Sequence, residues 1–183
     1  MKKFFVLIGA ACAVLSLQVG AADAGSSKTL EAAEQGDAEA QEELGYMYEL
    51  GSGVSQDDAE AVKWYRKAAD QGHAEAQFKL GRMYFNGWGI YNYYPDYTEA
   101  LKWYRKAADQ GGPGGVFMFS GINAQYELGV MYENGLGTPQ DYVMAHMFYN
   151  ISASANDSGP GARDARKDRD SLARRMTREQ IAK

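Results

Sequence analysis

The chain repeats itself almost letter for letter, and this feature restricts its fold more than any other. Residues 60–72 recur as residues 99–111 with one difference, Val62 in the first copy and Leu101 in the second. A match of this length does not arise by chance within one chain. The sequence therefore predicts a repeat architecture, in which each copy is one structural unit that packs on the next.

The segment upstream of each copy is repeated as well. Residues 38–48 recur as residues 74–84, and a third copy occupies residues 123–132. The third copy is followed by Ala-His-Met-Phe-Tyr, where the first two copies are followed by Ala-x-x-Trp-Tyr. Leu44 and Leu80 are equivalent positions, so the repeating unit is about 36 residues long.

Each unit has the pattern of two antiparallel helices. Apolar residues recur at helical spacing in the first half of the unit and again in the second half. In the first unit these residues are Ala40, Leu44, Met47 and Tyr48, followed by Ala61, Trp64, Tyr65, Ala68 and Ala69. A Gly-x-Gly pair follows each first helix, and Asp57, Asp96 and Asp141 stand where each second helix needs an N-cap.

Glycine also stands inside each first helix, at Gly45, Gly81 and Gly129. In a helix interior glycine costs about 1 kcal/mol against alanine, and we expect close approach of the partner helix to compensate. A single hairpin cannot bury its apolar stripe, so the units must stack. The predicted fold is all-α: a right-handed α–α solenoid of about three repeats, with an N-terminal half-repeat and a C-terminal capping helix.

The repeats place the predicted solenoid at residues 29–156. Its repeats cover about residues 37–72, 73–111 and 123–156, and an insertion at 112–122 separates the second repeat from the third.

Both ends of the solenoid need covering. Residues 30–36 match the end of a second helix and supply the half-repeat. In the capping segment, 157–183, Pro160 can open a helix, and Thr177 with Gln180 fits a capping box for a short last turn. The apolar face of this capping helix consists of Ala162, Ala165, Leu172 and Met176. Seven to nine helices are expected in all.

Residues 1–21 have the order of a secretory signal peptide. Lys2 and Lys3 precede an apolar run, and small residues follow it. We expect cleavage after Ala21 or a neighbouring alanine, a short linker at 22–28, and export to the periplasm or secretion. The run is too short for a bilayer span, so no transmembrane segment is expected in the mature chain. Cys12, the only cysteine, lies inside this segment.

Charge is unevenly distributed along the chain. Residues 31–60 contain ten acidic and no basic side chains, whereas residues 163–183 contain eight basic and four acidic ones. The formal net charge of the chain is −5. This balance argues against nucleic acid as a partner, because phosphate contacts need a dominant basic surface.

The sequence carries no motif for catalysis, metal binding or cofactor binding. His73 and His146 are far apart and have no ligand-like spacing to a carboxylate. The acidic residues of the first repeat form no loop of alternating carboxylates, and the Gly-x-Gly turns lack a phosphate-loop lysine. We therefore expect no enzyme activity, no cofactor and no metal.

The repeats resemble the Sel-one-like repeat family, relatives of the tetratricopeptide repeats. The resemblance rests on the string Ala-x-Ala-Gln-x-x-Leu-Gly-x-Met-Tyr-x-x-Gly-x-Gly, followed by Ala-x-x-Trp-Tyr-x-Lys-Ala-Ala-x-Gln-Gly, and covers about residues 29–156. It implies a superhelical scaffold for protein partners, in bacterial signalling, envelope or secretion-related systems. It also implies that the first helix of each unit lines a concave groove.

Four positions of each first helix would then face this groove. They are Glu39, Glu42, Tyr46 and Glu49 in the first repeat, Glu75, Phe78, Arg82 and Phe85 in the second, and Asn123, Tyr126, Val130 and Glu133 in the third. The groove is expected to be acidic at one end and aromatic in its middle, which suits a segment with basic and apolar side chains. A solvated face without a ligand is the alternative.

Two places depart from the repeat. The turn of the second repeat is three residues longer than its counterparts and carries four tyrosines and a tryptophan, and the insertion at 112–122 carries an apolar run. Such rings are typical of binding loops, but they could also fold back over the solenoid, and the insertion could be buried. The candidate partner-binding residues are Phe78, Arg82, Phe85, Trp88, Tyr91, Tyr93, Tyr94, Tyr97, Phe117, Met118, Phe119 and Tyr126. Because both departures fall in or beside repeat two, we predict one continuous surface centred on Tyr93, Tyr94, Phe117 and Phe119.

Three functions remain after these exclusions. The first is a non-enzymatic scaffold in the bacterial envelope, an adaptor or regulator that acts on one protein partner through the groove and the loops of repeat two. The second is an immunity protein that neutralises a toxic secreted effector. The third, a cell-wall or β-lactam hydrolase, is disfavoured because cysteine-rich relatives suggest it and the mature chain would have no cysteine. We favour the first, with the chain acting as a monomer.

Overall fold

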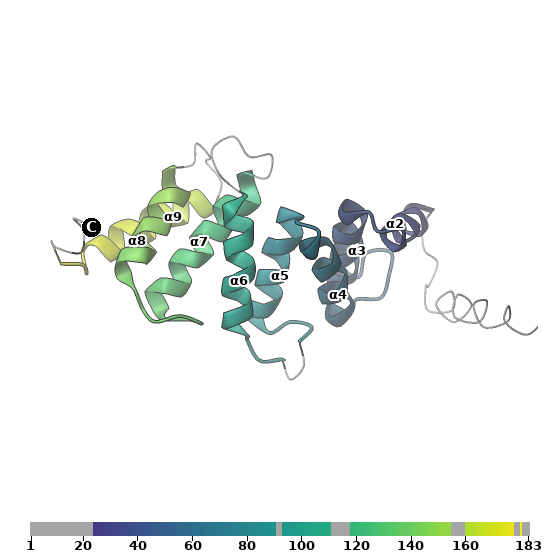
Figure 1. The fold of residues 1–183 in the computed structure, drawn as a ribbon, viewed down its shortest axis with the longest axis horizontal. Coiled ribbons are helices and arrows are strands. Elements are labelled where there is room, and N and C mark those ends of the chain that lie inside the picture. The colour runs from purple at the N-terminus through teal and green to yellow at the C-terminus, as the bar shows by residue number, and fades with distance from the viewer. Residues whose placement is uncertain (1–23, 91–92, 111–117, 155–159, 178–179, 181–183) are drawn as a thin grey trace, which may run out of the picture.

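The computed structural model describes residues 24–90, 93–110, 118–154, 160–177 and 180. Within these residues it contains eight helices and no strand. The helices are α2 (Ala24–Glu34), α3 (Ala38–Leu50), α4 (Asp58–Asp70), α5 (Ala74–Asn86), α6 (Tyr97–Asp109), α7 (Met118–Asn134), α8 (Tyr142–Ser154) and α9 (Pro160–Ala173). Figure 1 shows them following one another along the long axis of the molecule, from α2 at one end to α9 at the other. The predicted all-α helical-repeat solenoid is confirmed.

Three helical hairpins form the three repeats. Helix α3 packs on α4, α5 on α6 and α7 on α8, and each second helix packs on the first helix of the next unit. The first helices of successive units also touch, because α5 contacts α7 and α7 contacts α9. Helices α2 and α9 cover the two ends by packing on α3 and α8.

A glycine–tyrosine contact closes each hairpin. A Cβ atom on Gly81 would lie 2.6 Å from Cδ1 of the Tyr104 ring. The two equivalent pairs are Gly45 with Tyr65 at 2.6 Å and Gly129 with Tyr149 at 2.5 Å. No side chain larger than hydrogen fits at these distances without displacing the ring. The expected close approach of the partner helix at these glycines is therefore confirmed.

Buried glutamines connect neighbouring repeats. The side-chain amide of Gln77 donates to the carbonyl oxygen of Ala69 at 3.1 Å, and its own oxygen accepts from Nε2 of Gln110 at 2.7 Å. Gln41 makes the same two bonds, donating to a carbonyl oxygen of α2 at 3.0 Å and accepting from Gln71 at 2.8 Å. Each amide thus satisfies polar groups of the preceding and the same repeat, which lets it lie inside the core.

The turns follow the capping pattern expected from the sequence. Gly87 ends α5 with a φ of 73°, a left-handed conformation that glycine adopts without a Cβ clash. The Asp57 carboxylate accepts from two backbone N–H groups in the first turn of α4, at 2.9 and 3.0 Å. Asp96 and Asp141 cap α6 and α8 in the same way, so the three predicted N-caps are confirmed.

The apolar core is divided into a large cluster and a small one. The large cluster extends from α4 to α9. The small cluster consists of Ala33, Ala40 and Leu44 in α2 and α3, with Trp64 packed against it. Trp103 is 3% exposed in the large cluster, whereas its counterpart Trp64 is only partly buried. The two tryptophans are therefore not equivalent, because Trp103 belongs to the large cluster whereas Trp64 packs against the small one.

The C-terminal cap matches the prediction. Helix α9 begins at Pro160, and its apolar residues Ala162, Ala165 and Leu172 are buried. Met176, which was expected on the same helix face, lies in the turn after the helix end at Ala173 and is also buried. Beyond it, the Thr177 N–H donates to Oε1 of Gln180 at 2.8 Å, and the Gln180 N–H donates to Oγ1 of Thr177 at 3.3 Å. These two bonds form the expected capping box.

Two helices begin earlier than the sequence indicated. Helix α2 starts at Ala24, inside the stretch 22–28 that was expected to be a linker. Helix α7 starts at Met118, inside the expected insertion 112–122, so the end of the insertion is the first turn of a helix. The remaining part of the insertion, the expected signal peptide at 1–21 and Cys12 lie outside the described residues. Within the described part of the chain, no helix has the length and apolar character needed to cross a membrane.

Candidate protein-binding surface

The candidate residues fall into groups with different surroundings. The first is the first-helix face, which we define as the side formed by Glu42, Lys79, Arg82, Tyr126 and Glu133 on α3, α5 and α7. The second is the aromatic turn, which we define as Trp88, Tyr93 and Tyr94 between α5 and α6. Phe119, at the start of α7, belongs to neither.

The aromatic residues of α5 pack into the core instead of lining a free groove. Phe78 is buried, and its ring centroid lies 5.8 Å from that of Tyr104. Phe85 packs edge-on against Tyr97 at 5.4 Å and also faces Tyr104 at 6.4 Å. The prediction that Phe78 and Phe85 are free anchors for a partner is therefore wrong for Phe78, and Phe85 is partly buried.

Phe85 replaces a glutamate that the other two repeats use to satisfy a tyrosine. The Tyr65 hydroxyl donates to Glu49 at 2.6 Å, and the Tyr149 hydroxyl donates to Glu133 at 2.9 Å. Burial, followed by the bond to Glu49, raises the pKa of Tyr65 above its ordinary value. In repeat two the equivalent residue is Phe85, so Tyr104 faces an aromatic ring at this position. Repeat two thus exchanges a polar contact for an apolar one.

Ion pairs between repeats occupy part of the first-helix face. Lys79 Nζ lies 2.6 Å from Glu42 and 3.9 Å above the ring of Tyr46. Arg82 lies 3.9 Å from Glu49, and its guanidinium carbon is 5.9 Å from the ring centroid of Trp88. The two cations of α5 therefore neutralise part of the acidic end that the sequence predicted.

The third repeat has a partly buried acid, Glu127, and a hydrogen-bonded tyrosine, Tyr126, on α7. Burial raises the pKa of the Glu127 carboxyl above its ordinary value, and the charge of Arg82 partly opposes the shift. The Tyr126 hydroxyl donates to Asp168 of α9 at 2.9 Å, and its ring packs on Tyr149. Tyr126, a candidate partner contact, is thus held by its own chain.

The aromatic turn, in contrast, is open to solvent. Trp88 is 41% exposed, Tyr93 78% and Tyr94 76%. These rings do not fold back over the solenoid, which was one of the two alternatives for this turn. Tyr97 is the exception, because it begins α6 and its ring packs on Phe85. Tyr91 lies outside the described residues.

The turn and the insertion do not form one continuous surface. Ser120, in the first turn of α7, donates a hydrogen bond to Glu75, in the first turn of α5. Trp88 follows the other end of α5, and a thirteen-residue helix spans about 20 Å. In Figure 1 the turn between α5 and α6 and the start of α7 accordingly lie at opposite edges.

The predicted surface centred on Tyr93, Tyr94, Phe117 and Phe119 is therefore wrong as a single site. Phe119 is 57% exposed at its own edge, while Ile122 of the same turn is buried. Phe117 and the side chain of Met118 lie outside what the structure describes.

No cluster of metal-binding side chains is found among the described residues. They contain no group of three or more histidine, cysteine or acidic side chains placed to hold a metal ion. Nδ1 of His73 accepts from the N–H of Ala76 at 3.3 Å and so serves as the N-cap of α5. His146 contacts Asn150 on the same helix at 3.1 Å.

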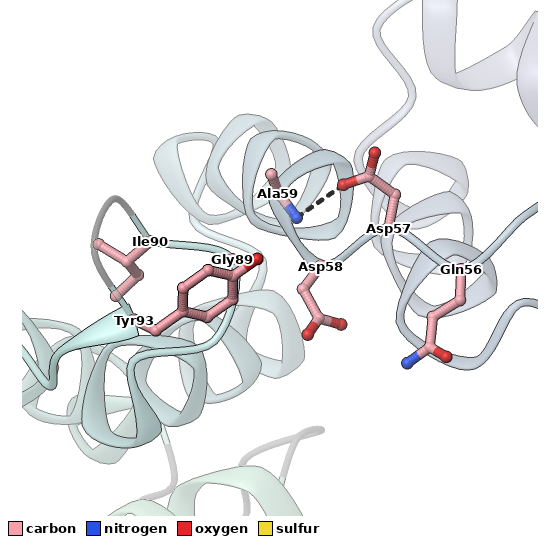
Figure 2. Close-up of a pocket in the computed structure, with 7 residues that line it drawn as sticks. All are labelled: Gln56, Asp57, Asp58, Ala59, Gly89, Ile90 and Tyr93. Carbon is pink, nitrogen blue, oxygen red and sulfur yellow. Dashed lines mark hydrogen bonds between the residues drawn. The ribbon is translucent and has the colours of Figure 1, made fainter.

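One pocket was not predicted from the sequence. The long turn of repeat two and the start of α4 enclose an open pocket, which brings Asp57 and Asp58 beside Tyr93 (Figure 2). The sequence identified Asp57 as an N-cap. It did not show that Tyr93 lies across the repeat boundary from Asp58, because this placement depends on a turn of unusual length. The three extra residues of that turn were the only indication of the pocket in the sequence.

Comparison with protein-family models matches the Sel1 repeat three times, at residues 38–73, 74–112 and 122–157. The chain belongs to the Sel1 repeat family. The matched spans contain the hairpins α3–α4, α5–α6 and α7–α8, so each Sel1 repeat is one of the hairpins described above. Sel1 repeats typically mediate protein interactions and form generally non-enzymatic scaffolds, which agrees with the sequence analysis.

Two solved structures of Sel1 type resemble the chain. The Sel1 repeat protein from Oxalobacter formigenes is 41% identical, with a TM-score of 0.62, over 72% of this chain and 49% of that one. A protein called c5321, described as a protective antigen present in uropathogenic Escherichia coli strains displaying an SLR fold, is 34% identical, with a TM-score of 0.69, over 86% of this chain and 30% of that one. This Sel1 repeat chain thus spans about half of the first relative and less than a third of the second. None of the curated proteins compared with it matches.

Proposed function

We propose that this Sel1 repeat protein is a non-enzymatic adaptor or regulator that binds a protein partner in the bacterial envelope through the aromatic turn. The exposure of Trp88, Tyr93 and Tyr94 is the observation that carries the proposal. Folding does not require these rings, because repeats one and three form the same hairpin with a shorter turn. Tyrosine and tryptophan concentrate binding energy at interfaces, with anchors worth about 2 kcal/mol or more each.

The first-helix face has a secondary role in this proposal. The ring of Tyr126 packs on Tyr149 of the second helix, and Lys79 and Arg82 are engaged by glutamates of the preceding repeat. A partner would therefore gain its apolar contacts at the aromatic turn. The acidic first repeat next to it would attract basic segments during the approach of the partner.

The envelope location is supported by the order of residues 1–21. A basic start, an apolar run and small residues around Ala21 are the features of a cleaved export signal. An exported scaffold without catalytic residues needs a partner that is itself in or beyond the inner membrane, such as a sensor or an assembly factor.

Capture of envelope proteins on the purified chain tests the proposal. The test variant combines Trp88→Ser, Tyr93→Asn and Tyr94→Ser, with asparagine at 93 because it tolerates the left-handed backbone of that residue. The matched control combines Met147→Ser and Ile151→Ser on α8, two exposed apolar side chains away from the turn. Circular dichroism and thermal melting check that both variants keep the wild-type fold.

The wild type and the α8 control should retain the same envelope protein, and the turn variant should lose it. Retention by the turn variant at full strength would show that the partner binds elsewhere, with the acidic first repeat as the next candidate. A toxic effector as the retained protein would contradict the adaptor role and support an immunity role.

A further inference from the structure

A pocket opens where the aromatic turn meets the start of α4, at the boundary between repeats one and two. It has a volume of about 820 Å³, and its lining includes Asp57 and Asp58 of the first repeat and Gly89, Ile90 and Tyr93 of the second. Figure 2 shows the Tyr93 ring and the Asp58 side chain on two sides of the opening. The pocket thus combines carboxylates from one repeat with an exposed aromatic ring from the next.

Backbone contacts fix the walls of the pocket. A Cβ atom on Gly89 would lie 2.1 Å from the carbonyl oxygen of Asp58, so the turn and the start of α4 are in direct contact. Tyr93 has a φ of 54°, and it is the one non-glycine residue with a positive φ in the part of the chain that the structure describes. Its N–H donates to the carbonyl oxygen of Ile90 at 3.0 Å. These contacts fix the backbone from which the exposed ring projects.

The next repeat boundary lacks this combination of groups. Gly137 approaches Tyr97 as Gly89 approaches Asp58, with 2.4 Å between the Cβ position and the carbonyl oxygen. Tyr97 stands in the place of Asp58, and its ring is packed on Phe85. The turn after that boundary is also three residues shorter. The pocket is therefore particular to repeats one and two and is not a by-product of repeat stacking.

The pocket is acidic, and one of its carboxylates is free to bind a ligand. Asp57 is engaged by two N–H groups of α4. Within the described residues, the Asp58 carboxylate has neither a hydrogen bond nor an ion pair. No lysine or arginine is among the lining residues, and residues 31–60 carry ten acidic and no basic side chains. A cationic group is therefore the complementary occupant.

We propose that this pocket receives an arginine side chain of the protein partner, with its guanidinium paired to Asp58 and stacked on the ring of Tyr93. The inference rests on the proposed function and names the chemistry of the partner segment. The guanidinium group is planar, so it can donate to a carboxylate at its edge and lie on an aromatic face at the same time. An ammonium group can satisfy either contact but has no flat face to stack. Apolar residues beside the arginine would contact Trp88 and Tyr94, which are exposed on the same turn.

Nuclear magnetic resonance titration of the purified, nitrogen-15-labelled protein tests this inference without the partner. The probe is N-acetyl-L-argininamide, and its neutral isostere N-acetyl-L-citrullinamide and the lysine analogue are the comparison probes. The readout is the shift of the backbone amide signals of Ala59, Gly89 and Tyr93. The variants are Asp58→Asn and Tyr93→Asn, with Asp70→Asn, an exposed acid at the other end of α4, as the matched control.

The arginine probe should shift these signals saturably in the wild type and in Asp70→Asn. Asp58→Asn and Tyr93→Asn should each weaken binding about tenfold, the loss of one charge-assisted contact or one stacked ring. The citrulline probe should cause no saturable shift, and the lysine probe should bind more weakly than the arginine probe. The unchanged spectrum elsewhere verifies that each variant is folded.

The inference would be overturned by an absence of saturable shifts, by equal affinity in Asp58→Asn, or by equal affinity for citrulline. Shifts of the same signals that depend on protein concentration, without any probe, would show that a second copy of the chain fills the pocket and would also overturn it. The titration uses no partner, so its failure leaves the envelope capture unaffected, and a failed capture leaves the titration unaffected.

Discussion

The ring of Tyr104 occupies the space that a side chain at position 81 would need. A Cβ atom on Gly81 would lie 2.6 Å from Cδ1 and 2.7 Å from Cε1 of that ring. The same contact recurs in the other two hairpins, so it sets the distance between the helices of every repeat.

Gly81→Ala should destabilise the protein by about 1–3 kcal/mol, although alanine is the better helix former, because the added methyl group displaces a buried ring. Equilibrium unfolding in urea measures the loss. In a Tyr104→Leu background the same substitution should cost less, since leucine leaves room for the methyl group. An equal loss of unfolding free energy in both backgrounds would show that the Tyr104 ring does not limit the side chain at position 81.

The two tryptophans of the repeated second helix should differ in their effect on stability. Trp103→Ala removes a side chain that is 3% exposed and should cost about 3–5 kcal/mol. Trp64→Ala should cost clearly less, because Trp64 is only partly buried against the small N-terminal cluster. Thermal and urea unfolding of the two variants compare them directly, and equal losses would contradict the division of the core.

Gln77→Ala should cost about 1–3 kcal/mol, because it leaves the buried carbonyl oxygen of Ala69 and the partly buried amide of Gln110 without their partner. Gln140→Ala is the matched control, since the Gln140 amide also donates to a backbone carbonyl but is exposed. Urea unfolding should show little change for the control. A similar loss in both variants would show that burial of the amide does not matter.

Much of this fold could be predicted because the structure of each repeat is determined by local contacts. The interior glycines, the capping aspartates and the apolar stripe depend on contacts within one hairpin or with an identical neighbour, and the structure confirms them. Phe78 was assigned to a groove by its offset from Leu80, but ring tilt toward Tyr104 buries it. Periodicity gives the face of a helix and not the direction of a ring.

The separation of the aromatic turn from the insertion could not be predicted for a related reason. The long turn and the insertion are close in sequence, yet the length of α6 separates them, because one precedes that helix and the other follows it. The pocket beside Asp58 depends on contact between two repeats at a place where they differ. No repeat-to-repeat comparison could supply that contact.

Glu127 should make stability depend on pH. Its folded-state pKa is raised above the ordinary value of 4.5, chiefly by burial, so the folded protein holds this proton more tightly than the unfolded chain. Stability from this group therefore increases as pH falls through the folded pKa and is complete below 4.5, whereas at neutral pH the buried charge is a cost. Glu127→Gln should be more stable than the wild type at neutral pH, with a difference that shrinks toward pH 4.5.

Urea unfolding across this pH range measures the difference. Glu31→Gln, on the exposed side of α2, is the control. A constant difference between Glu127→Gln and the wild type at every pH would show that the carboxyl is not perturbed.

We predict that the protein is exported and that its mature form begins near Ala22, because residues 1–21 have the order of a secretory signal peptide. Intact mass measurement of the protein from a cell-envelope fraction identifies its first residue. An intact Met1 in that fraction would contradict cleavage.

The division of the core determines which end of the molecule opens first. The small cluster of Ala33, Ala40 and Leu44 is buried by fewer helices than the large one, and the ring of Tyr48 packs against both. Helices α2 and α3 can therefore fray as a local unit while α4 to α8 keep their amide hydrogens protected from exchange. The aromatic turn joins α5 to α6 within the protected part, so thermal fraying at the N-terminal end leaves the aromatic turn in its native shape.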